Sequence, residues 1–143
     1  MIKILAGGKK TSGAYQELTN EYEKRLKKPF DLKWEVMDED KLTAELKKWP
    51  FSGRDFVILC DERGKMLGSP EFAQVLENSF NYSKNVTIII GGAYGFDDEI
   101  RSKADLVWSF SKLVFPHMLF RVMVTEQIYR AQEILSGSKY HHE

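Results

Sequence analysis

Two short apolar segments constrain the fold of this chain more than any other feature. They read DFVILCD at residues 55–61 and NVTIII at residues 85–90, and neither shows a sustained alternation of apolar and polar side chains. Strands that are buried on both faces have this pattern, as they do in parallel sheets that helices cover on both sides. The segments therefore predict a parallel sheet that contains both of them.

Helix and strand patterns alternate along the rest of the chain. Further strands are predicted at residues 1–6, 32–36 and 105–111, and helices at 13–28, 42–49, 69–80, 97–104 and 117–135. Ser69 and Pro70 suit the N-cap and the first position of a helix. This order predicts an α/β fold with a mostly parallel sheet flanked by helices, and the length of 143 residues suits one domain, 1–143.

The composition is that of a soluble globular protein, with 43% hydrophobic and 29% charged residues. No apolar stretch approaches the roughly 20 residues of a membrane-spanning helix, and no signal peptide is recognisable, so we expect a cytoplasmic protein without a membrane partner. Cys60, the single cysteine, excludes an internal disulfide. The 21 basic and 21 acidic residues balance, so net charge alone gives no reason to expect a nucleic-acid partner.

Three predicted strand ends carry unusual residues, at 60–65, 91–95 and 109–116. Ligands of parallel α/β folds bind at the carboxyl ends of the strands. The glycines of IIIGGAYGF allow backbone to approach a ligand, or simply form a tight turn. The pattern is neither G-x-G-x-x-G nor a P-loop, which favours a nucleoside over a phosphate-bearing ligand. The segment SFSKLVFPH can wrap an adenine ring or serve as an ordinary connection.

The last predicted helix and the tail offer other chemistry. Arg130 can pair with Glu126 on a solvated face of the helix, or its guanidinium can bind a phosphate. The tail ends in His141 and His142, but no further His or Cys stands at ligand spacing, so we predict no metal site. His117 is a lone histidine and no G-x-S-x-G elbow is present, which argues against a serine hydrolase.

The motifs DERGK with SPEFA, IIIGGAYGF, WSFSKLVFPHMLFRVMVTEQIYRAQEI and a terminal YHHE occur together and in this order. In this combination the chain resembles the RlmH family of SPOUT-class methyltransferases over essentially its whole length. The resemblance implies S-adenosylmethionine-dependent methylation of N3 of a pseudouridine in 23S ribosomal RNA, on assembled ribosomes. It also implies the α/β-knot fold, in which the C-terminal third forms a deep trefoil knot.

The resemblance further assigns roles to individual residues. It implies a homodimer in which the last helix lies at the interface and the tail of one subunit reaches the cofactor pocket of the other. His141 becomes the candidate general base, Tyr140 a candidate for stacking on a base, and Arg130 and His142 candidates for holding RNA phosphates. The cofactor would be bound by Cys60, Gly92, Ser111, Lys112, Leu113, Val114, Phe115 and Pro116.

Two positions depart from the family pattern. His142 stands where arginine or lysine is usual, and Cys60 stands where an aliphatic residue is common. A non-catalytic module that binds a nucleoside or the ribosome on the same scaffold is the alternative hypothesis, and such a module has no need of Tyr140 and His141. A flavodoxin-like or nucleotide-binding α/β protein is a third reading.

Overall fold

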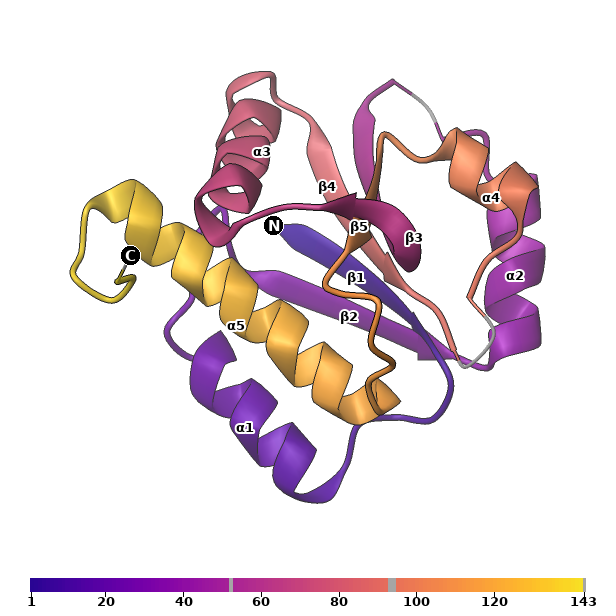
Figure 1. The fold of residues 1–143 in the computed structure, drawn as a ribbon, viewed down its shortest axis with the longest axis horizontal. Helices are drawn as coiled ribbons and strands as arrows, with labels where there is room; N and C mark the ends of the chain where they lie inside the picture. The colour runs from indigo at the N-terminus through magenta and orange to yellow at the C-terminus, as the bar shows by residue number, and fades with distance from the viewer. Residues whose placement is uncertain (52, 93–94, 143) are drawn as a thin grey trace.

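The computed structural model describes residues 1–51, 53–92 and 95–142 and shows strands and helices in strict alternation (Figure 1). The predicted order of elements is confirmed. The elements are β1 (Ile2–Gly7), α1 (Gly13–Glu23), β2 (Leu32–Met37), α2 (Glu39–Lys48), β3 (Asp55–Met66), α3 (Ser69–Asn81), β4 (Asn85–Ile90), α4 (Asp98–Lys103), β5 (Leu106–Ser109) and α5 (His117–Ser136).

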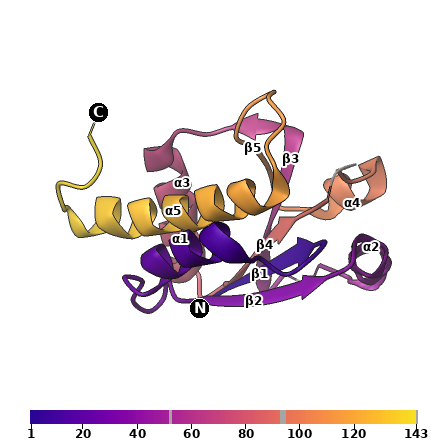
Figure 2. The same ribbon diagram turned by 90° about the horizontal axis from the view of Figure 1, so that it is seen from below.

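The sheet has the strand order β2-β1-β4-β3-β5, and every neighbouring pair is parallel. Helices α3 and α5 cover one face, with α1 packed against α5, while α2 and α4 cover the other face (Figure 2). The predicted α/β class with a parallel sheet flanked by helices is confirmed. The trefoil knot stays a prediction.

The two apolar runs are explained by this layering. In β3, Ile58 and Cys60 pack into the core under α3 and α5, whereas Val57 and Leu59 pack into the core under α2 and α4. Successive side chains of a strand point to opposite faces, so both sets must be apolar when helices cover both faces. The same holds for β4, which lies between β1 and β3.

Strand β3 is longer than predicted. The sequence suggested that it ends at Asp61, but it continues to Met66 with a register shift against β5 between Cys60 and Lys65. Gly64 makes this close pairing possible, because a Cβ at this position would lie 2.8 Å from the backbone nitrogen of Trp108. The charged residues 61–63 are therefore part of an irregular strand and not of a turn.

Helix α1 is shorter than predicted and ends at Glu23 instead of residue 28. The backbone that follows is bound to α5 instead, because Lys27 N–H donates to Oε1 of Gln132 at 2.7 Å and Nε2 of Gln132 donates to the carbonyl of Arg25 at 3.0 Å. The predicted apolar face of α1 is also only partly buried, with Leu18 47% exposed.

The N-cap of α3 is Gly68, so the prediction of Ser69 at this position was wrong. The hydroxyl of Ser69 donates to Oε1 of Gln127 at 2.7 Å and thereby joins α3 to α5. Oε1 of Glu71 accepts from the backbone N–H of Gly68 at 3.2 Å, which satisfies one free donor at the helix start.

In the part of the chain that the structure describes, none of the helices combines the length and the apolar character that crossing a bilayer demands.

Candidate active site

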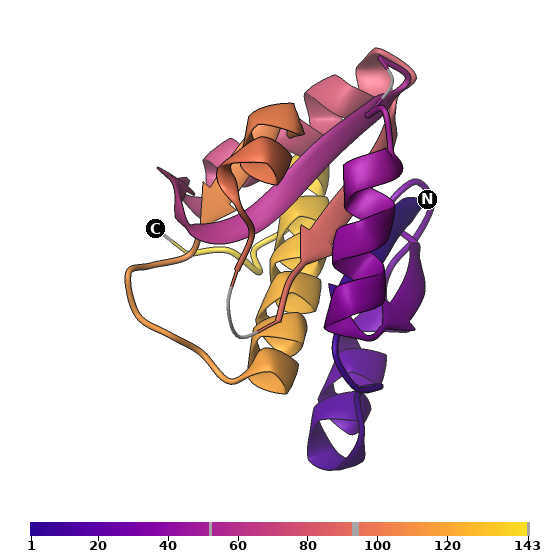
Figure 3. The same ribbon diagram turned by 90° about the vertical axis from the view of Figure 1, so that its right-hand side faces the viewer.

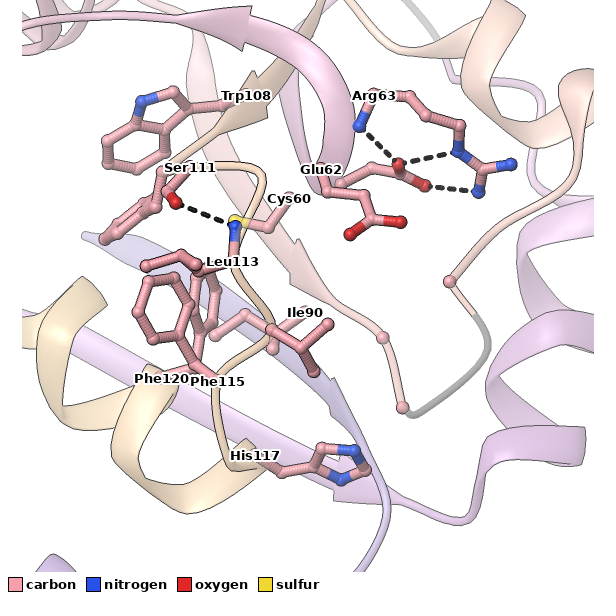
Figure 4. Close-up of a pocket in the computed structure, with 16 residues that line it drawn as sticks. Cys60, Glu62, Arg63, Ile90, Trp108, Ser111, Leu113, Phe115, His117 and Phe120 are labelled. Carbon is pink, nitrogen blue, oxygen red and sulfur yellow. Dashed lines mark hydrogen bonds and ion pairs between the residues drawn. The ribbon is translucent and has the colours of Figure 1, made fainter.

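A pocket of about 200 Å³ lies where β4 and β5 end, beside the middle of β3, at the edge where parallel α/β folds bind ligands (Figure 4). Its apolar wall consists of rings in contact with one another. Trp108 lies 4.4 Å from Phe110, and Phe110 lies 4.6 Å from Phe120, measured between ring centroids. Such a wall suits a flat apolar or aromatic group.

Most residues predicted to bind a cofactor line this one pocket. These are Cys60, Gly92, Ser111, Leu113, Val114 and Phe115. Lys112 and Pro116 belong to the same loop, but their side chains are exposed and are not part of the pocket wall. The sequence did not separate the loop residues that line the pocket from those that do not, and cofactor binding by this loop stays a prediction.

The loop between β5 and α5, residues 110–116, bulges away from the sheet (Figure 3). Two serines shape its start, because the hydroxyl of Ser109 donates to the carbonyl of Ser111 at 3.2 Å and Oγ of Ser111 accepts from Leu113 N–H at 2.8 Å. Beyond that turn the loop presents apolar side chains to solvent, with Leu113 70% and Val114 87% exposed. A ligand in the pocket would bury them.

The glycines that follow β4 are needed for close packing. A Cβ on Gly91 would lie 2.7 Å from the ring of Phe96, and a Cβ on Gly92 would overlap the side chain of Glu39. The backbone of both glycines therefore forms the pocket edge directly. Residues 93 and 94 of the predicted motif lie outside the described residues.

Asp61 connects β3 to the segment after the glycines through hydrogen bonds. Its side chain is only 1% exposed, and it accepts from the backbone N–H and the guanidinium of Arg63 at 2.9–3.0 Å. It also accepts from Phe96 N–H at 3.4 Å, and the guanidinium of Arg63 donates to the carbonyl of Phe96 at 2.8 Å. Burial disfavours the charged carboxylate, but these hydrogen bonds outweigh burial and lower the pKa of Asp61.

The role of Asp61 was not predicted from the sequence, because DERG also has the composition of a charged turn. The available signal was an acidic residue directly after a fully apolar run, where a carboxylate is buried with its strand and must find donors. Glu62, in contrast, is exposed and its carboxylate faces the pocket (Figure 4).

Cys60 behaves as a small apolar residue. Its side chain is buried in the middle of β3, and burial, followed by the charge of Asp61, raises the pKa of the thiol far above its usual range. A thiol that stays protonated is a poor nucleophile, so Cys60 contributes shape to the pocket and no covalent chemistry.

The predicted tail residues come together in a second cluster, on the C-terminal half of α5. Nε of Arg130 donates to Oε1 of Glu126 at 2.8 Å, and the hydroxyl of Tyr140 donates to the same oxygen at 3.2 Å. The guanidinium carbon of Arg130 lies 4.8 Å from the centroid of the Tyr140 ring, and its NH1 lies 3.0 Å from Nδ1 of His141. The side chain of His142 is exposed. The tail is therefore folded against its own helix.

The two clusters lie at opposite ends of α5 (Figure 1). His117, in the first turn, lines the pocket, whereas Arg130 belongs to the tail cluster. With a rise of about 1.5 Å per residue, Arg130 lies about 20 Å from His117 along the helix. Within one chain the structure does not bring the predicted base and the predicted cofactor pocket together.

Among residues 1–51, 53–92 and 95–142, no three or more His, Cys, Asp or Glu side chains are arranged to hold a metal ion.

Comparison with known proteins places this geometry in a family. Residues 1–141 match the family model described as predicted SPOUT methyltransferase. The chain belongs to the SPOUT methyltransferase family. Ribosomal RNA large subunit methyltransferase H of Caldicellulosiruptor bescii is 40% identical, over 99% of each chain. The protein of the same name from Acholeplasma laidlawii is 36% identical, over 98% of each chain. The resemblance to the RlmH family is confirmed.

Two solved structures show how far the SPOUT fold is shared. A probable methylase family protein from Haemophilus influenzae matches with a TM-score of 0.56 at 15% identity, over 97% of this chain and 67% of that one. The SpoU methyltransferase AviRb of Streptomyces viridochromogenes, solved with its cofactor AdoMet, matches with a TM-score of 0.50 at 11% identity, over 96% of this chain and 61% of that one. At these identities the likeness concerns the fold.

Proposed function

We propose that this SPOUT methyltransferase transfers a methyl group from S-adenosylmethionine to N3 of a pseudouridine in 23S ribosomal RNA of assembled ribosomes. One observation carries the proposal above the others. Six of the eight residues that the family resemblance singled out for the cofactor converge on one pocket, at the carboxyl ends of β4 and β5 and beside the middle of β3. Full-length relatives that are named ribosomal RNA large subunit methyltransferase H support the choice of substrate.

The pocket residues suit S-adenosylmethionine. The rings of Trp108, Phe110 and Phe120 offer an apolar surface for adenine, and the backbone of Gly91 and Gly92 offers polar groups at the rim. The carboxylate of Glu62 faces the pocket and is complementary to the positive charge of the cofactor. When bound, S-adenosylmethionine supplies a methyl group that is already electrophilic because it is attached to a sulfonium.

The pocket of about 200 Å³ is smaller than the roughly 300–1,000 Å³ of typical small-molecule sites. The exposed apolar loop 110–116 explains the difference, because its Leu113 and Val114 gain apolar contacts when they fold over a nucleoside. When this loop closes over the ligand, space that is now open to solvent becomes part of the enclosed pocket, and water is excluded from the methyl group.

The tail supplies the remaining chemistry. The imide N3–H of the target base must lose its proton, and His141 is the proposed general base. Tyr140 stacks on a base and Arg130 and His142 hold phosphates. Since the tail and the pocket are about 20 Å apart along α5 in one chain, we propose a homodimer in which the tail of each subunit enters the pocket of the other. The exposed apolar side chains of Leu18 and Leu119 support a contact through α1 and α5.

A mixing experiment tests the shared site. Glu62→Lys reverses a charge in the pocket but leaves the tail intact, whereas a chain ending at residue 138 keeps the pocket and lacks the tail. Each variant alone should be inactive, and a mixture should regain activity because one of its pockets pairs an intact lining with an intact tail. If the mixture stays inactive while both variants fold and form dimers, the shared site is wrong.

Because the net charge is zero, we propose the assembled ribosome and not free RNA as the substrate. Affinity for free RNA depends largely on positive charges that neutralise phosphates, so we expect weak binding to an isolated RNA hairpin. Ribosomal proteins and folded RNA then supply part of the site. This substrate also locates the protein in the cytoplasm.

Mass spectrometry of 23S ribosomal RNA tests the reaction as a whole. RNA from cells that lack this protein should contain an unmethylated pseudouridine at one position, and expression of the intact chain should restore the methyl group. A chain without residues 139–143 should not restore it. Restoration by that truncated chain would favour a binding module, and an unchanged RNA would contradict the proposed reaction.

A further inference from the structure

Arg121 of α5 is a buried cation with no carboxylate partner among the described residues. The residue is 1% exposed, and no ion pair joins it to a described Asp or Glu. Its Nε is buried and has no hydrogen-bond partner in the described part of the chain. Burial lowers the pKa of its guanidinium. A buried, uncompensated charge is costly, so stability of the fold alone is a poor reason for an arginine here.

The hydrogen bonds that the Arg121 side chain makes with described residues all go to one segment. NH1 donates to the carbonyl of Lys9 at 2.6 Å and to the hydroxyl of Thr11 at 3.0 Å, and NH2 donates to the carbonyl of Gly7 at 3.2 Å. These residues connect β1 to α1, and we name residues 7–12 the basic loop. The arginine therefore holds the backbone of the basic loop on its buried side, while the side chains of Lys9 and Lys10 stay exposed.

The basic loop lies beside the cofactor pocket. Gly8 has a φ of 120°, which favours glycine, and a Cβ on it would lie 3.9 Å from Nδ1 of His117. His117 lines the pocket and stands one helical turn before Arg121. The hydroxyl of Ser12 approaches the sulfur of Met118 at 3.9 Å, which joins the end of the loop to the same helix start.

The exposed lysines at this rim offer contacts to an anionic partner. Lys9, Lys10 and Lys112 are exposed on the two loops that meet at the start of α5. The acidic groups nearby are Glu62, which faces the pocket, and three residues at the start of α2: Asp38, Glu39 and Asp40. Glu39 packs against Gly7 and Gly92, whereas Asp38 and Asp40 are exposed and follow Met37, whose carbonyl accepts from Gly8 N–H at 2.8 Å. Because the whole chain carries as many acidic as basic residues, exposed lysines at the pocket rim matter more than the net charge.

We propose that the basic loop binds the phosphates of the RNA strand that delivers the target base to the pocket, and that Arg121 is the positioning residue for this contact. The inference rests on the proposed function and adds the surface by which the substrate is oriented. Arg121 touches neither cofactor nor substrate; it acts by fixing where Lys9 and Lys10 point.

The first experiment removes the two lysines. Lys9→Ala/Lys10→Ala should lower kcat/KM for methylation of ribosomes by about tenfold and should make its dependence on salt shallower, by a slope of about 1 to 2. The affinity for S-adenosylmethionine, measured by calorimetry, should not change. The matched control is Lys47→Ala/Lys48→Ala, which removes the same charge from the last turn of α2 and should leave kcat/KM unchanged.

The outcomes separate the two proposals. If the wild-type protein methylates ribosomes and the Lys9/Lys10 variant does so equally well, the inference about the basic loop is wrong and the proposed function stands. An equal loss in the control variant also overturns the inference, because the charge effect is then general. If the wild-type protein transfers no methyl group to ribosomes, the proposed function fails and the inference fails with it.

The second experiment tests Arg121 without removing its charge. Arg121→Lys keeps a cation but cannot bind three oxygens of the loop as a guanidinium does. We expect a several-fold lower kcat/KM for ribosomes and an unchanged cofactor affinity. In the Arg121→Lys background, replacing Lys9 and Lys10 by alanine should lower kcat/KM by a clearly smaller factor than in the wild type, because the lysines are already displaced. Purely additive losses would show that Arg121 has only a structural role.

Discussion

Arg130 donates toward Nδ1 of His141 across 3.0 Å. A guanidinium has no acceptor, so Nδ1 must accept, and the neutral imidazole then carries its proton on Nε2. In this arrangement neither ring nitrogen offers a free lone pair. His141 can act as a base only when the tail leaves its own helix, which is what a tail that enters the pocket of a second subunit must do.

The first prediction concerns His141. His141→Ala should lower the single-turnover rate of methyl transfer to ribosomes by about 10²- to 10⁴-fold, the usual contribution of a general base. Cofactor affinity and the urea midpoint should stay near wild type, since the side chain lies on the tail. A rate that is unchanged at every pH between 6 and 9 (about the range of stable ribosomes) would remove His141 from the mechanism.

Tyr140 allows a separate test of the tail cluster. Burial, followed by the charge of Glu126, raises the pKa of Tyr140 to about 12 from the ordinary value of 10.0. Because the folded state holds the Tyr140 proton more tightly than the unfolded state does, the protein loses folding stability as pH rises from 10.0 to about 12. Tyr140→Phe should remove that alkaline loss, measured by urea denaturation, and should keep methylation within a few-fold. Tyr140→Ala also loses the ring and should be far less active.

Gly64 is predicted to be indispensable for the pairing of β3 with β5. A Cβ there would overlap the backbone of Val107 and approach the nitrogen of Trp108 to 2.8 Å, and backbone cannot rotate away. Gly64→Ala should lower the free energy of unfolding by at least about 1–3 kcal/mol in urea denaturation. Gly53→Ala is the matched control, because nothing lies within 4 Å of a Cβ at that position. Equal stability of the two variants would contradict the close pairing.

The sheet could be predicted from the sequence because each strand is marked by a pattern within its own few residues. The runs at 55–61 and 85–90 are typical of strands buried on both sides, and the structure places them side by side as β3 and β4. The extension of β3 to Met66 depended on Gly64 and on backbone of β5 more than 40 residues away, so no local pattern predicted it. The early end of α1 likewise depends on Gln132, which is distant in sequence.

The candidate site likewise contains residues that could be recognised from the local sequence and residues that could not. Loop 109–116 was recognisable from its own residues, together with the family resemblance. Asp61 and Arg121 were not, because each is defined by partners in other segments: Phe96 for the first, and Lys9 and Thr11 for the second. A charged residue looks the same in a sequence whether it is solvated or buried among distant backbone groups.

Asp61 leads to a prediction on pH. Its lowered pKa means that the folded state favours the carboxylate, so the stabilisation is present above the unfolded pKa of about 3.9 and is lost as pH falls through the lower folded value. Asp61→Asn should cost about 1.5–3 kcal/mol of unfolding free energy at pH 7, as expected for hydrogen bonds to a charged group. The difference from wild type should shrink below about pH 4. A difference that does not vary with pH would contradict a stabilising carboxylate.

Asp61→Asn should also weaken cofactor binding, because the same carboxylate holds the N–H of Phe96 and thereby the glycine-rich edge of the pocket. Calorimetry with S-adenosylmethionine at pH 7 measures this effect directly. Arg25→Gln is a suitable control, since that arginine pairs with Glu21 on the surface of the molecule and does not line the pocket.

The last prediction concerns His142, whose imidazole stands where the family resemblance leads us to expect a fixed positive charge. Histidine changes its charge near neutral pH, whereas arginine stays charged throughout. If the exposed side chain of His142 contacts an RNA phosphate, kcat/KM for ribosomes should fall from pH 6 to pH 8 more steeply in the wild type than in His142→Arg. At pH 8 the arginine variant should be several-fold faster, with equal cofactor affinity and a steeper salt dependence, because one more phosphate is neutralised. Parallel pH profiles of the two proteins would mean that position 142 does not touch the RNA.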